Sequence, residues 1–116
     1  MQIKGCAIGK RSMQDWSTFI SNVVKGKGFY TPTSLDTEEE REKVLGKLML
    51  VVTEIAEAAE AVRHNDWDNF KEEMADAMIR MFDMCGAMNL DIEEEIENKM
   101  IINVKRPIRH GKSTSL

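Results

Sequence analysis

Apolar residues recur along this chain at steps of three and four, the spacing that places them on one side of an α-helix. The pattern is clearest between residues 36 and 63, where seven residues make one continuous stripe: Leu48, Val51, Val52, Ile55, Ala58, Ala59 and Val62. Alternation with a period of two, which would indicate strands, is almost absent. The sequence therefore predicts an all-α fold.

Signals that begin and end helices divide the chain into four of them. Ser12-x-x-Asp15 resembles a capping box and opens the first helix, and glycines follow it. Pro107 ends the last helix because proline cannot continue one. The predicted spans begin at Ser12 and end at Gly26 or Gly28, begin at Asp36 or Thr37 and end near Arg63, and then cover about 67–87 and 92–105.

Length and composition set the broad class. A chain of 116 residues predicts one domain, here a four-helix bundle over 1–116 with an N-terminal extension (1–11) and a basic tail (107–116). The net charge of −4 argues against a general nucleic-acid binder. Two cysteines without a metal-binding spacing, and no long apolar segment, favour a reducing, cytoplasmic setting and no membrane contact.

Four acidic residues stand in two short pairs, Glu54-x-x-Glu57 and Glu73-x-x-Asp76. At this spacing both members of a pair project from one side of a helix. If the second and third helices are antiparallel neighbours, the four carboxylates converge, and a hard divalent cation would relieve their repulsion. The four residues are therefore predicted to hold Mg²⁺, with Mn²⁺ as the alternative, and to be catalytic.

Acidic pairs at this spacing are most often a solvated surface, so the metal hypothesis needs support. Leu50 and Ala61 lie one turn on either side of the first pair, and the other neighbours are small alanines, which would let a second helix approach. The second pair continues into a polar stripe with Arg80 and Asp83. Asp83 could support Arg80 or a metal-bound water, and a structural role is at least as plausible.

The fourth predicted helix carries a stripe of the opposite charge. Lys99, Asn103 and Arg106 follow i, i+4, i+7 spacing, and two cations beside an amide donor suit a polyphosphate. Cations also simply favour the C-terminal end of a helix, and taken alone that explanation is the stronger one. Beside a carboxylate cluster, the phosphate hypothesis becomes competitive.

Together these residues resemble the MazG-type nucleoside triphosphate pyrophosphohydrolases, an all-α family. The resemblance covers roughly residues 44–113 and rests on three segments, KLMLVVTEIAEAAEAVR, NFKEEMADAMIRMFDMCGAMNLDIEEEIENKMIINVKRP and RHGKS. It implies Mg²⁺-dependent hydrolysis of a (deoxy)nucleoside triphosphate between the α- and β-phosphates, giving a monophosphate and pyrophosphate. It further implies phosphate binding by Lys99, Asn103 and Arg106, and by Arg109, His110 and Lys112 of the tail.

Two further expectations concern the base and the assembly. The aromatic candidates for the base are Trp16, Phe19, Phe29 and Tyr30, although most such side chains belong to a core. Nine methionines are more than one small bundle can hide, which indicates a subunit interface. The resemblance agrees, since it implies a homo-oligomer, either a dimer or a tetramer.

Other functions remain open from the sequence. Within the enzymes, a phosphoribosyl-ATP pyrophosphatase or a dUTPase-like relative would share the acidic pairs. A di-iron carboxylate bundle would need Glu-x-x-His motifs, whereas His64 and His110 fall in a turn and a tail. A non-enzymatic helical dimerisation module is the alternative outside the enzymes, and unlike the enzyme it would not need a metal ion.

Overall fold

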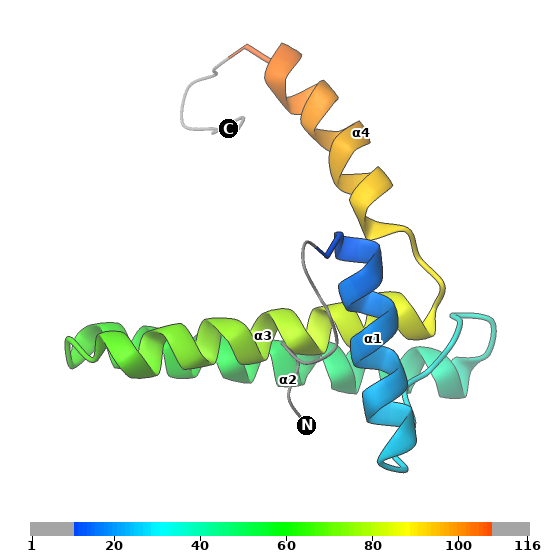
Figure 1. Ribbon diagram of the computed structural model, residues 1–116, viewed down its shortest axis with the longest axis horizontal. Coiled ribbons are helices and arrows are strands. Elements are labelled where there is room, and N and C mark those ends of the chain that lie inside the picture. Colours follow the sequence, from blue (N-terminus) through cyan, green and yellow to red (C-terminus); the bar gives the residue numbers. More distant parts are fainter. Residues whose placement is uncertain (1–10, 108–116) are drawn as a thin grey trace.

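The computed structural model describes residues 11–107, and this part of the chain contains four helices and no strand. The helices are α1 (Met13–Gly26), α2 (Glu38–Arg63), α3 (Trp67–Ala87) and α4 (Ile92–Lys105) (Figure 1). The all-α prediction is confirmed, and the helix boundaries agree with the expected ones to within two residues.

The boundaries agree because each helix begins at a side chain that caps it. Ser12, Thr37, Asp66 and Asp91 each accept a hydrogen bond from the backbone N–H three residues later. The first of these is a full capping box, in which the Asp15 carboxylate also accepts from the Ser12 N–H. Such local bonds satisfy donors that a helix start leaves unpaired, so sequence alone locates them.

Helices α2 and α3 form an antiparallel hairpin, the long horizontal element of Figure 1. The turn between them is short. The Asp66 N–H donates to the Ala61 carbonyl at 2.8 Å, and Asn65 adopts a left-handed backbone with φ of 53°. Asparagine tolerates this conformation better than most residues do. Ala58, Ala61 and Ala77 are buried along the hairpin, and small side chains there let the two helix backbones approach closely.

Helix α1 crosses the C-terminal part of α3 at a point of very close contact. Ser17 is fully buried there and faces Gly86. A Cβ added at Gly86 would meet the Ser17 backbone carbonyl and would lie 2.7 Å from the Ser21 Cβ. The crossing therefore requires glycine for lack of space, and not for its backbone freedom.

Helix α4 leaves the hairpin instead of lying along it, so the bundle in one chain is open (Figure 1). Its main contact is with α1, where the Met13 N–H donates to the Glu93 carboxylate at 3.0 Å. No residue of α4 is buried. Large apolar side chains stay exposed on α2, α3 and α4, among them Leu45, Met49, Val52, Met78, Met81, Ile101 and Val104.

Two smaller expectations concern the cysteines and the membrane. Cys85 is a free, half-buried thiol, and burial raises its pKa, which agrees with an unreactive side chain. Cys6 lies outside the described residues. None of the helices within residues 11–107 combines the length and apolar character needed to cross a membrane.

Replacing Gly86 with alanine should destabilise the fold by about 1–3 kcal/mol, because the added methyl group meets backbone that cannot move without displacing α1. The matched control is Gly46→Ala in α2, where an added Cβ meets nothing within 4 Å and should leave the free energy of unfolding equal or higher. Urea unfolding of both variants measures this. Equal stabilities for the two variants would contradict the close contact.

Candidate metal centre

The hairpin brings three of the four predicted carboxylates together. Glu54 and Glu57 on α2 and Glu73 on α3 each offer a carboxylate oxygen, and these oxygens all lie within 4.8 Å of one another. Glu54 is buried, Glu73 is half-buried and Glu57 is exposed. Asp76, the fourth predicted ligand, is exposed on α3 and is not part of this group of three.

A basic residue completes the cluster. The Arg80 Nε lies 3.4 Å from Glu54 Oε1 across the two helices. Arg80 stands seven residues after Glu73, two helical turns along the same side of α3, so the spacing held a signal for this contact. The sequence placed Arg80 in the polar stripe but did not identify Glu54 as its partner.

Asp83, considered as a support for Arg80 or for a metal-bound water, has a different partner. Its Oδ2 accepts a hydrogen bond of 2.7 Å from the Thr31 hydroxyl, and both residues are buried. Thr31 belongs to the segment between α1 and α2, so this bond ties that segment to α3. Asp83 therefore has a structural role, the alternative that the sequence had left open.

The two carboxylates of α2 perturb that of Glu73 on α3. Partial removal from water, followed by hydrogen bonding with Glu54 and Glu57 and repulsion from them, raises the pKa of Glu73 from 4.5 to about 7. The donor set is entirely carboxylate oxygen, which fits Mg²⁺ or Mn²⁺ and does not fit a soft metal ion. A divalent cation at this place would remove the repulsion that now favours a proton on Glu73.

The basic stripe lies apart from the carboxylates within one chain. Lys99 is exposed and Asn103 half-buried on α4, and Arg106 is exposed just after the helix ends, but α4 extends away from the hairpin that carries the acids (Figure 1). The remaining predicted phosphate ligands, Arg109 and Lys112, and with them His110, lie outside the described residues. One chain therefore does not bring the predicted phosphate-binding residues of α4 to the predicted metal ligands.

The predicted base-binding aromatics divide into two places. Trp16 and Phe19 pack edge to face on α1 with ring centres 6.2 Å apart, and the Arg11 guanidinium lies over both rings. Phe29 and Tyr30 are exposed and line a cavity of about 330 Å³.

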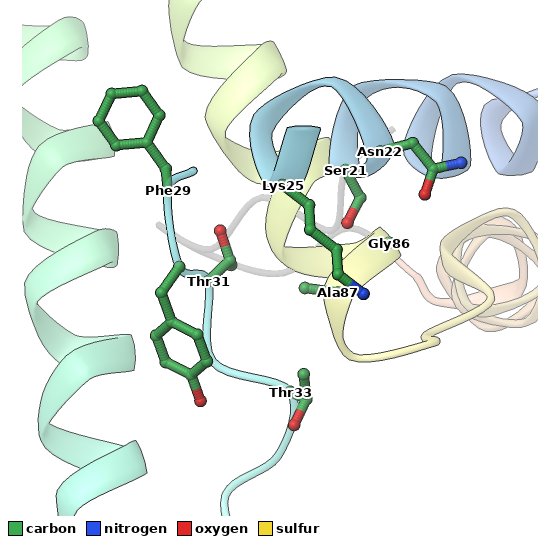
Figure 2. A pocket seen from close by; sticks show the side chains of 9 residues that line it. Ser21, Asn22, Lys25, Phe29, Thr31, Thr33, Gly86 and Ala87 are labelled. Carbon is green, nitrogen blue, oxygen red and sulfur yellow. The ribbon is translucent and has the colours of Figure 1, made fainter. Parts of the chain in front are cut away.

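Figure 2 shows this cavity between α1, the following loop and the end of α3, with Lys25 and Thr31 on its walls. Gly86 also lines it, thirteen residues beyond Glu73. At 1.5 Å per residue Glu73 is therefore about 20 Å away along α3. Helix α1, with Trp16 and Phe19, crosses α3 at this same end, so in one chain neither pair of aromatics adjoins Glu73 (Figure 1).

The raised pKa of Glu73 predicts how stability depends on pH without metal. A folded-state pKa near 7 against 4.5 means that the folded protein binds more protons than the unfolded chain between these values. The free energy of unfolding contributed by Glu73 should therefore fall as pH rises from about 4.5 to 7. Urea unfolding in EDTA should show this fall in the wild type and a smaller one in Glu73→Gln, while exposed Glu72→Gln should behave like the wild type. An identical pH profile in Glu73→Gln would contradict the assignment.

The family of the chain follows from a comparison with known families. A model of the MazG nucleotide pyrophosphohydrolase domain matches residues 43–107, more than half of the chain. The matched segment begins in α2 and reaches the end of α4, so it includes both acidic pairs and the basic stripe. Neither the comparison with curated proteins nor the comparison with solved structures gave a match. The chain belongs to the MazG nucleotide pyrophosphohydrolase family.

Proposed function

We propose that this protein hydrolyses a nucleoside or deoxynucleoside triphosphate between the α- and β-phosphates in a reaction that depends on a divalent metal ion. Water adds to the α-phosphorus, the bond from that phosphorus to the bridging oxygen breaks, and the products are a nucleoside monophosphate and pyrophosphate. The observation that carries the proposal is the cluster of Glu54, Glu57 and Glu73 across the hairpin, in a family of nucleotide pyrophosphohydrolases.

The metal ligands in this proposal are the three clustered carboxylates, with Asp76 as a fourth. Asp76 stands three residues after Glu73 on α3, hence on a neighbouring part of the helix surface. A bound Mg²⁺ or Mn²⁺ would neutralise phosphate oxygens and make a bound water more acidic. Glu73 would be ionised when the metal ion is bound, because ligation needs the deprotonated carboxylate.

Arg80 acts in this proposal as a positioning residue. Its contact with Glu54 fixes one oxygen of a carboxylate that is only 8% exposed, and thereby directs the other oxygen. The same positive charge partly balances the acidic cluster. This charge balances only Glu54 directly, because Glu57 is exposed and has no ion pair within the described residues.

In this proposal a second copy of the chain supplies the phosphate-binding residues of α4. Lys99, Asn103 and Arg106 do not reach the carboxylates of their own hairpin (Figure 1). Exposed apolar side chains on the hairpin and on α4 are of the kind that subunit interfaces bury. In a homo-oligomer, either a dimer or a tetramer, α4 of one copy would lie beside the carboxylates of another and bind the β- and γ-phosphates.

A metal requirement separates this function from a non-enzymatic dimerisation module. The wild type should release pyrophosphate from a (d)NTP only when Mg²⁺ or Mn²⁺ is present. Glu57→Gln and Asp76→Asn should lower kcat at least a hundredfold, since each removes a ligand charge, and helicity and oligomeric size should not change. Glu72→Gln, a neighbouring exposed acid, is the matched control. Full activity in both ligand variants would refute the site, and activity in EDTA would refute the metal requirement.

If Lys99 binds phosphate in the site of another copy, Lys99→Ala should also be inactive, and the shared site then predicts complementation between this variant and Glu57→Gln. Co-produced Glu57→Gln and Lys99→Ala chains should recover about a quarter of wild-type activity in a dimer, because half of the dimers are mixed and one of the two sites in each is intact. Co-produced Glu57→Gln and Asp76→Asn chains should recover none, since both changes fall on the same hairpin. Absence of recovery in the first pair, with mixed oligomers verified by mass spectrometry, would place the whole site within one chain.

A further inference from the structure

A second cavity lies at the tip of the α2–α3 hairpin. It is open to solvent, has a volume of about 260 Å³ and is lined by six residues, Ala61, Val62, Asn65, Asp66, Trp67 and Phe70. Trp67 and Phe70 stack with ring centres 5.6 Å apart and planes 20° apart. Trp67 nevertheless remains 64% exposed, so the packing within the chain leaves much of its large apolar surface in contact with water.

The cavity adjoins the carboxylate cluster. Ala61 follows Glu57 by four residues on α2, and Phe70 precedes Glu73 by three residues on α3, so each is one turn from a carboxylate on the same side of its helix. Because the two helices are antiparallel, both steps lead toward the hairpin tip. One helical turn is about 5.4 Å, which is the order of the distance between an α-phosphate and its base across a ribose.

The chemistry of the walls suits a flat, mostly apolar group with a polar edge. Two aromatic rings and the Val62 side chain supply apolar surface, while Asn65 and Asp66 stand at the turn. The Asp66 Oδ1 already accepts from the Asn69 N–H as the cap of α3, which leaves the second carboxylate oxygen available. An amide and a carboxylate oxygen can recognise the donors and acceptors on the edge of a base.

We propose that this cavity binds the nucleobase of the substrate by stacking on Trp67, the exposed ring that Phe70 supports from its other side. The inference rests on the proposed function, which puts the triphosphate at the carboxylates. It differs from the sequence-based assignment of the base to Trp16, Phe19, Phe29 and Tyr30, because none of those residues adjoins the carboxylates in one chain. The sugar spans the single turn between cavity and metal ligands.

Binding of nucleoside monophosphates tests the base site without turnover. In a Trp16→Phe background Trp67 is the one remaining tryptophan, and its fluorescence should be quenched by at least one of dAMP, dGMP, dCMP and dTMP with Mg²⁺ present. Trp67→Leu should weaken binding of that nucleotide about tenfold by calorimetry, the usual effect of losing a stacking partner, and Phe70→Leu should weaken it less, because Phe70 acts by supporting the Trp67 ring. Trp67→Phe, which keeps a ring, should bind nearly as the wild type does.

Inorganic tripolyphosphate provides the matched ligand, because it carries the phosphates and no base. Its affinity should be unchanged in Trp67→Leu and Phe70→Leu, and oligomeric size should be unchanged as well. Equal weakening of nucleotide and tripolyphosphate, or a change in oligomeric size, would show that Trp67 is structural and would overturn the base site. So would an unaltered nucleotide affinity in Trp67→Leu alongside a loss in Tyr30→Leu.

The outcomes separate this inference from the proposed function. If no (d)NTP is hydrolysed while monophosphates still quench Trp67, the reaction is wrong and the base site remains. If hydrolysis occurs with normal KM in Trp67→Leu and Phe70→Leu, the reaction is right and the base binds elsewhere.

Discussion

The antiparallel pairing of α2 and α3 is the contact on which the rest of this structure depends. It is made possible by small residues, since Ala58, Ala61 and Ala77 are buried where larger side chains would push the helices apart. A short turn at Asn65 fixes the register. With that register the carboxylates of Glu57 and Glu73 come within 4.8 Å of each other, one helical turn from Ala61 and Phe70. The same pairing therefore determines the positions of the carboxylates and of the adjoining apolar cavity.

This register brings three carboxylates close together, and the neighbouring residues do not fully neutralise their repulsion. Arg80 contacts Glu54, but the pKa of Glu73 still rises to about 7. A sequence selected only for stability would place other residues here, since like charges in contact oppose folding. The arrangement is understandable if the cluster evolved to hold a cation, which is the basis of the proposed function.

The outer helices make very different contacts. Helix α1 packs against α3 at the close Ser17–Gly86 contact. The segment that follows α1 is held to α3 by the hydrogen bond from Thr31 to buried Asp83. Helix α4 has no buried residue and carries exposed isoleucines together with the basic stripe. A helix of that kind gains its stability from packing that one chain does not provide. The proposed oligomer would account for both features of α4, because one subunit contact would cover its apolar side chains and place its basic residues beside the carboxylates of another copy.

The sequence by itself determined the local structure of this protein. Caps such as Ser12 and Asp66 act over three residues, and apolar spacing identifies a helix without its partners, so the number and limits of the helices could be predicted. The acidic pairs were visible for the same reason. Only the tertiary structure decided which side chains meet. It brought Arg80 to Glu54, joined Asp83 to Thr31, and grouped Glu54 and Glu57 with Glu73 but not with Asp76. These outcomes depend on helix register and crossing angle, which arise from contacts between residues far apart in the chain.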